Sequence, residues 1–161
     1  MDITLRKVQQ SDSDNLLRWR NENTTIPWMG QTRALTLKEH NDWFNDAVLD
    51  PGLLFLIIEI DGVPCGQIRY KQMTIDGIKK SAKVSINISH EFHGKGIATL
   101  AFTKGSALVR RSMFADYVFA NVLPDNIGSV KAMKNAGFWV VKTHVVNGRD
   151  HLMMTDKQCV L

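Results

Sequence analysis

The fold is decided by residues 84–98, which read VSINISHEFHGKGIA. The first five of these alternate between apolar and polar side chains, which is the period-two pattern of a half-buried strand. After Gly96, the apolar residues Ile97, Leu100 and Ala101 recur at three- and four-residue steps, which is the spacing of a helix. The sequence therefore predicts a strand that passes through a glycine-rich turn directly into a helix.

This turn has the properties of an anion-binding site. The first N–H groups of a helix have no partners within the helix, and the positive end of the helix dipole lies beside them. Gly94 and Gly96 carry no Cβ, so the backbone can approach a bulky anion closely. We therefore expect a phosphate-bearing ligand at this turn.

The composition is that of one globular domain spanning residues 1–161, with 44% hydrophobic and 22% charged residues. The net charge is +4, but the basic residues are scattered, so we expect no nucleic-acid partner. The longest apolar run, 53–58, is far too short to span a bilayer, so we expect no membrane association. The histidines lack metal-ligand spacing, so we expect no metal.

The cysteine pattern bears on the redox compartment. Cys65 and Cys159 lie far apart in the sequence and form no metal-ligand motif, and the first residues do not resemble a secretory signal. We expect a reduced protein in the cytoplasm.

Periodicity and turn signals predict the element order β-α-α-β-β-β-α-β-α-β-β, a mixed sheet of the α/β class. Hairpin turns are expected at Asp61-Gly62, Asp76-Gly77 and Asn147-Gly148, and a capping box at Thr36–Glu39. The expected strands are 3–8, 53–60, 63–70, 81–89, 117–122, 139–146 and 151–155, and the helices follow the caps at 11–14, 36, 96 and 126.

Two known families of glycine-rich phosphate-binding loops do not match the sequence of this turn. A Walker A loop requires G-x-x-x-x-G-K-[ST], which this chain lacks at the turn. A dinucleotide loop requires G-x-G-x-x-G, and here Thr99 stands in the third glycine position. That loop also follows the first strand of a parallel sheet, whereas hairpin-linked strands precede the turn in this chain.

The segment 93–98 resembles the acetyl-coenzyme A loop of the GNAT N-acetyltransferases, Q/R-x-x-G-x-G/A, with His93 in the first position. Asn126-x-x-Ser129 followed by Gly137-Phe138 resembles the second motif of that family, N-x-x-S/A…G-F. The resemblance implies a single GNAT domain. Its central, mostly antiparallel twisted sheet would be splayed at the coenzyme strand and flanked by about four helices, with acetyl-CoA as co-substrate.

The same resemblance implies which residues hold the coenzyme. Backbone N–H groups of the turn would bind the pyrophosphate, and the strand segment 86–88 would pair with the pantetheine arm. Asn126 would bond to the pantetheine or cap its own helix, and both readings stay open. The implied coenzyme residues are Ile86, Asn87, Ile88, His93, Gly94, Lys95, Gly96, Ile97, Ala98, Asn126 and Ser129.

Two positions depart from the family pattern, and both concern proton transfer. Met133 stands where many members carry a tyrosine acid, and Lys83 stands where many carry a glutamate. The general acid and base are therefore unassigned. Candidates for the base or its relay are Tyr70, Ser85, Asn87 and His90, although His90 can equally be a surface loop residue.

Two further segments resemble those of one particular group of GNAT enzymes and bear on the acceptor. Segments 17–21 (LRWRN) and 40–44 (HNDWF) resemble the W-R-N and H-x-x-W-F segments of GNAT enzymes that acetylate nucleotide-linked amino sugars, including those of pseudaminic acid synthesis. This implies acetyl transfer to the primary amine of such a sugar by direct attack in a ternary complex. The implied substrate residues are Arg20, Trp28, Met29, His40 and Arg69.

Three questions stay open at this point. Trp19 and Trp43 suit the core of their helices as well as an acceptor site. The acceptor could instead be a protein N-terminus of the ribosomal-protein type, or the chain could bind acyl-CoA without turnover. Homodimer formation is also open.

Overall fold

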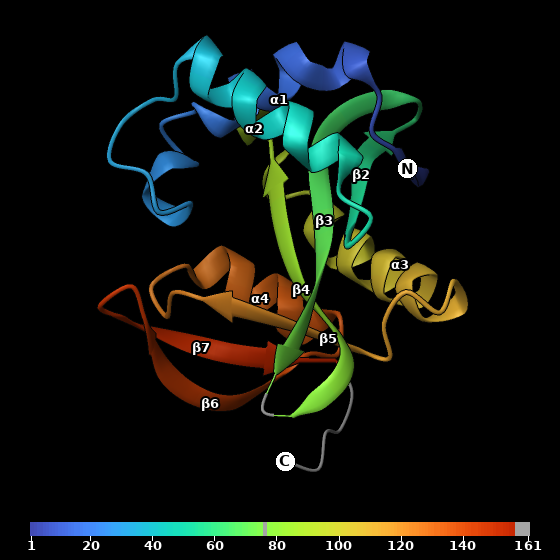
Figure 1. The fold of residues 1–161 in the computed structure, drawn as a ribbon, viewed down its shortest axis with the longest axis vertical. Helices are drawn as coiled ribbons and strands as arrows, with labels where there is room; N and C mark the ends of the chain where they lie inside the picture. Colours follow the sequence, from blue (N-terminus) through green and yellow to red (C-terminus); the bar gives the residue numbers. More distant parts are fainter. Residues whose placement is uncertain (76, 157–161) are drawn as a thin grey trace. The chain divides into compact units, whose positions relative to one another are not determined.

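The computed structural model describes residues 1–75 and 77–156. Asp76, half of one predicted turn, lies outside the described residues, as does Cys159. The order of helices and strands is the predicted one (Figure 1). The elements are β1 (Ile3–Lys7), η1 (Gln10–Asp12), α1 (Ser13–Arg20), η2 (Ile26–Trp28), α2 (Leu37–Leu49), β2 (Leu53–Ile60), β3 (Val63–Ile75), β4 (Ile78–Ile88), η3 (His90–Phe92), α3 (Ile97–Arg111), β5 (Tyr117–Val122), α4 (Ile127–Asn135), β6 (Trp139–Val146) and β7 (Arg149–Thr155).

The hydrogen-bonded strand order is β1-β2-β3-β4-β5-β7-β6. β4 pairs with β5 in parallel, whereas the pairs β1–β2, β5–β7 and β6–β7 are antiparallel. The predicted α/β class with a mixed sheet is therefore confirmed. Within the described part of the chain, no helix is long and apolar enough to cross a membrane.

The hairpin between β3 and β4 is longer than predicted. β3 runs to Ile75 rather than to residue 70, and β4 begins at Ile78 rather than at residue 81. Residues 71–74 are exposed, so this part of β3 shows none of the alternating burial on which the strand prediction depends.

Turn and cap chemistry account for several element boundaries. Asp61 and Gly62 adopt φ of 49° and 81°, and Asn147 and Gly148 adopt 50° and 76°, as a two-residue hairpin turn requires. The Thr36 side chain accepts a hydrogen bond from the Glu39 N–H, which confirms the predicted capping box at the start of α2.

The chain forms two compact units, and β3 and β4 pass through both. The first unit comprises Met1–Arg69 and Ile86–Ile97, and in it α1 and α2 lie side by side (Figure 1). Its core contains Leu16 and Trp19 of α1, Phe44 of α2, and Phe55 and Ile57 of β2. The interpretation of Trp19 as a core residue is confirmed, because its side chain is fully buried.

The second unit comprises Tyr70–Ser85 and Ala98–Leu161. Phe102 of α3 packs against Phe138, with ring centroids 5.6 Å apart. Tyr70 of β3 is fully buried against α3, and a Cβ added at Gly105 would lie 2.0 Å from its hydroxyl oxygen. Gly105 therefore permits a close approach of α3 to Tyr70.

Candidate coenzyme and acceptor sites

The glycine turn has the geometry of a phosphate cradle. Gly94 and Gly96 both adopt φ of 75°, the left-handed region that favours glycine, and α3 begins at the next residue, Ile97. A Cβ added at either glycine would meet no atom within 4 Å, so the backbone lies open on that side. Successive free N–H groups at a helix N-terminus suit the pyrophosphate of a coenzyme, so the residues present fit this group.

The turn is held in shape by its own side chains. His93 Nε2 lies 2.8 Å from the Ile88 carbonyl oxygen, which it can bond only as a donor. The Lys95 ammonium lies 5.1 Å from the centroid of the Phe92 ring, and Ile97 is buried. His93 therefore ties the turn to the end of β4. Its backbone N–H is also engaged, since it donates to the His90 carbonyl at 3.1 Å, so the predicted role of the His93 N–H in holding the pyrophosphate is not supported.

The predicted coenzyme strand is tightly packed against its neighbour. A Cβ added at Gly66 of β3 would lie 2.5 Å from the Asn87 carbonyl oxygen and 2.9 Å from the Ile88 Cα. The Asn87 side chain is buried and accepts a hydrogen bond from the Thr25 hydroxyl at 3.2 Å. Because a carboxamide does not take up a proton near neutral pH, Asn87 can orient a group but not act as the base.

Asn126 and Ser129 lie in the second unit and contact each other. The Asn126 side chain accepts a hydrogen bond from the Ser129 N–H at 3.2 Å and caps α4. The capping interpretation is therefore confirmed, and the amide NH₂ of Asn126 is not used by that bond. Met133, which stands in the place of the usual tyrosine, is buried in α4.

Two candidate proton-transfer residues lie in very different surroundings. Tyr70 is fully buried in the second unit, where burial raises its pKa above the usual range. His90 lies in the first unit with an exposed imidazole, and its Nδ1 is 3.4 Å from a carboxylate oxygen of Glu22. Tyr70 thus remains protonated at neutral pH, whereas His90 is open to solvent.

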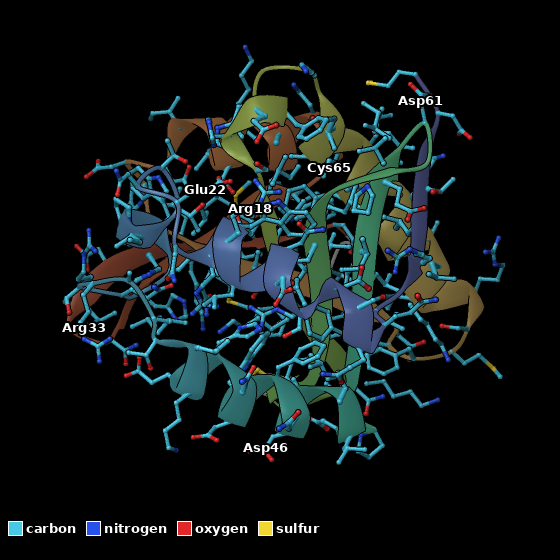
Figure 2. The ribbon with its side chains drawn as sticks, turned by 90° about the horizontal axis from the view of Figure 1, so that it is seen from above. Arg18, Glu22, Arg33, Asp46, Asp61 and Cys65 are labelled. Carbon is cyan, nitrogen blue, oxygen red and sulfur yellow. The ribbon has the colours of Figure 1, made fainter. Side chains whose placement is uncertain are left out.

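Sequence reasoning missed Glu22, which follows the W-R-N segment directly. Its carboxylate accepts hydrogen bonds from the Ser89 hydroxyl at 2.7 Å and from the His90 N–H at 2.9 Å. Figure 2 shows Glu22 beside Arg18 at the C-terminal end of α1. The one available sequence signal was a carboxylate in an otherwise uncharged stretch of loop, and it did not indicate a partner 67 residues away.

Arg69 and Arg20 form a cationic pair in the first unit. The Arg69 guanidinium lies over the rings of Trp43 and Phe55, at 4.9 and 5.6 Å from their centroids. Its Nε is buried and has no partner in the described part of the chain. Burial, and then the charge of Arg20, lower the pKa of Arg69 to about 10. Arg20 Nε donates to the Gln31 side chain, and burial lowers its pKa. Within residues 1–75 and 77–156, no carboxylate pairs with either arginine.

The other predicted acceptor residues divide into one buried and two accessible side chains. His40 is 1% exposed, its Nε2 lies 2.9 Å from the Ser13 hydroxyl, and its ring stacks on Phe44. Burial lowers the pKa of His40, which favours the neutral imidazole. Trp28 is 40% exposed in η2, and Met29 beside it is partly exposed.

Comparison with known proteins decides the family. A family model described as "Acetyltransferase (GNAT) domain" matches residues 2–139. The chain belongs to the GNAT acetyltransferase family. The predicted fold and enzyme class are therefore confirmed. No curated protein sequence matches this GNAT chain.

Solved structures share the fold at low sequence identity. Aminoglycoside acetyltransferase AAC(6')-Ib, in complex with paromomycin and acetyl-CoA, has a TM-score of 0.85 at 18% identity, over 98% of this chain and 94% of that one. Spermidine N-acetyltransferase from Vibrio cholerae, with CoA and spermine, has a TM-score of 0.81 at 19% identity, over 95% and 94%. RimJ from Mycobacterium smegmatis, with CoA-disulfide, has a TM-score of 0.78 at 24% identity, over 95% and 80%. At these identities the likeness shows the fold and leaves the acceptor open.

Proposed function

We propose that this GNAT enzyme acetylates the primary amine of a nucleotide-linked amino sugar. The amine nitrogen attacks the acetyl carbon of acetyl-CoA in a ternary complex. A C–N bond forms, the thioester C–S bond breaks and coenzyme A leaves as the thiolate. The amine nitrogen, which becomes positively charged as it attacks, loses a proton to a base. Orientation of the two substrates supplies much of the acceleration.

The observation that carries this proposal is the cationic pair of Arg69 and Arg20. An arginine buried without a counterion is costly, and an anionic ligand would remove that cost. The diphosphate of a nucleotide-linked sugar supplies such an anion. Paromomycin and spermine carry several amines, so acceptors of that kind would meet like charge at Arg69 and Arg20.

The acceptor loop offers a surface for the rest of such a ligand. Trp28 is exposed in a short loop that also contains Pro27 and Gly30, and an exposed indole can stack on a nucleobase or on a sugar face. We assign Trp28 and Met29 to these contacts. His40 keeps a supporting role in this proposal, because its buried ring holds α2 against Ser13 of α1.

The coenzyme roles follow from the motif together with the fit of the turn. Backbone N–H groups of residues 94–98 would hold the pyrophosphate, because the His93 N–H is already bonded to the His90 carbonyl. The backbone of 86–88 would pair with the pantetheine arm. In the second unit, Asn126 would offer its amide NH₂ to the pantetheine. His90, with an exposed imidazole, is the base that we favour over the fully buried Tyr70.

Thiol release tests the proposal. Purified protein is incubated with acetyl-CoA and one of four acceptors, namely a UDP-linked amino sugar, kanamycin, spermine, or a peptide with a free N-terminus. We expect free thiol and an N-acetylated product with the UDP-linked sugar alone. Turnover with the peptide or with the polyamines instead would overturn the acceptor assignment. Tight coenzyme A binding without turnover on any acceptor would favour a binding module.

A further inference from the structure

We propose that Glu22 is a positioning residue that couples the coenzyme turn to the acceptor loop, defined here as residues 21–31. Its carboxylate holds the end of β4, from which the turn starts, and its backbone holds the loop that carries Trp28. Coenzyme binding at the turn is therefore linked to the conformation of the acceptor loop. This inference depends on coenzyme use but not on the identity of the acceptor.

Both oxygens of the Glu22 carboxylate bond to the two residues that directly follow β4. One oxygen accepts the Ser89 hydroxyl at 2.7 Å, and the other accepts the His90 N–H at 2.9 Å. The Glu22 side chain is 9% exposed and the Ser89 residue is completely buried. Hydrogen bonds to an ionised carboxylate are stronger than those between neutral groups, and burial protects them from water.

Ser89 and His90 are the residues on which the turn is built. The Phe92 N–H donates to the Ser89 carbonyl at 2.9 Å, and the His93 N–H donates to the His90 carbonyl at 3.1 Å. The Ser89 N–H in turn donates to the Cys65 carbonyl of β3 at 2.9 Å. A shift of Ser89 or His90 would therefore be transmitted within a few residues to Gly94 and Gly96.

The backbone of Glu22 organises the acceptor loop. Its carbonyl oxygen accepts the N–H groups of Thr25, at 2.8 Å, and Ile26, at 3.1 Å, where η2 begins. The buried Thr25 hydroxyl then donates to the Asn87 side chain on β4, so the loop is attached to the coenzyme strand a second time. Trp28 and the glycine turn are thus connected through Glu22 by a short series of hydrogen bonds.

A neighbouring contact, between α1 and η3, provides a matched control. Arg18 and Glu91 form an ion pair at 3.4 Å, and both side chains are more than half exposed. An exposed pair of this kind contributes little, because solvent screens it. Arg18→Gln therefore perturbs the same region without breaking the buried connection.

The experiment follows Trp28 by fluorine NMR as coenzyme A is added. The protein is labelled with 5-fluorotryptophan, and Trp28→Phe identifies the Trp28 resonance. We expect the Trp28 resonance of the wild type to shift on coenzyme A binding. In Glu22→Ala, the dissociation constant for coenzyme A should rise about tenfold and the Trp28 resonance should no longer respond, since coupling between sites is reciprocal. Arg18→Gln should behave as the wild type.

If Glu22→Ala does not fold, Ser89→Ala tests the same connection with a smaller change, because it removes only one of the two hydrogen bonds to the Glu22 carboxylate. It should weaken both coenzyme binding and the Trp28 response. Melting temperatures are measured for every variant, since a purely structural role would lower the melting temperature while leaving the Trp28 response intact. That result would overturn the proposal. So would a Trp28 resonance of the wild type that does not shift when coenzyme A is added. Unchanged coenzyme A affinity in Glu22→Ala or Ser89→Ala would overturn it as well.

Discussion

At the scale of single residues, Gly96 combines a backbone constraint with an open surface. Its φ of 75° strains any L-residue by about 1–2 kcal/mol, and a Cβ would project into open space, where we propose that the coenzyme pyrophosphate binds. Gly96→Ala should therefore lose both stability and coenzyme A affinity. Thermal unfolding and calorimetric titration with coenzyme A measure the two effects separately.

Gly148 supplies the control for this prediction. It adopts φ of 76° in the β6–β7 turn and is equally open, so Gly148→Ala should cost similar stability. Its affinity for coenzyme A should stay at the wild-type value. Equal affinity losses in both alanine variants would show that strain, rather than the cradle, explains the effect.

We predict that Arg69 contributes to acceptor binding and lowers the stability of the ligand-free protein. Arg69→Met keeps an unbranched chain against Trp43 and Phe55 but removes the unpaired charge. Its kcat/KM for a UDP-linked amino sugar should fall roughly thirtyfold, which corresponds to a free-energy change of about 2 kcal/mol. Its melting temperature should stay the same or rise, because an uncompensated charge has been removed. A large fall in melting temperature would indicate a structural role instead.

His40 should make the protein sensitive to acid. Burial lowers its pKa in the folded state, so below about pH 6.5 the unfolded chain binds a proton that the folded chain does not. The free energy of unfolding should fall, by at most about 1.4 kcal/mol per pH unit, as the pH drops from 6.5 to the folded-state pKa. Denaturant titrations of the wild type and of His40→Gln, at pH 7.5 and 5, test this. A difference between the two proteins that does not change with pH would contradict it.

At the scale of elements, the contact of β3 with β4 depends on Gly66. A methyl group there would lie 2.5 Å from the Asn87 carbonyl oxygen, so the strands would have to move apart. Gly66→Ala should lower the free energy of unfolding by about 1–3 kcal/mol and weaken coenzyme A binding. Urea titration and coenzyme A titration provide the measurements.

Gly128 in α4 is the control position for Gly66, because an added Cβ there would have no close neighbour. A Cβ there would meet nothing within 4 Å, so Gly128→Ala should leave stability unchanged or raise it by up to about 1 kcal/mol. If Gly66→Ala and Gly128→Ala were equally stable, the close approach at Gly66 would not be required.

The elements also show where sequence reasoning succeeds and where it fails. The Asn147-Gly148 turn, the Thr36 cap and the Asn126 cap were predicted because their signals are local. The extension of β3 to Ile75 was missed, because its exposed residues carry no burial pattern. The Gln72 side chain donates a hydrogen bond to the Phe114 carbonyl 42 residues away, and a sequence does not display such a contact.

At the scale of the whole molecule, the net charge of +4 should assist an anionic acceptor. The kcat/KM for a UDP-linked amino sugar, at saturating acetyl-CoA, should fall several-fold between 50 and 500 mM KCl, since salt screens long-range attraction. Arg69→Met should show a weaker dependence on salt. A kcat/KM independent of salt would argue against an anionic acceptor.

The sequence by itself determined the strand, the glycine turn and the helix of residues 84–98, and through its motifs the GNAT family and its coenzyme. Those features depend on neighbours in the chain, where periodicity and glycine placement dictate the backbone. Only the tertiary structure decided that Glu22 holds Ser89 and His90 and that His40 is buried. It also decided that Arg69 lies over Trp43, with its Nε unpartnered among the described residues. These contacts join residues far apart in the chain, and packing sets their distances, burial and charge environment.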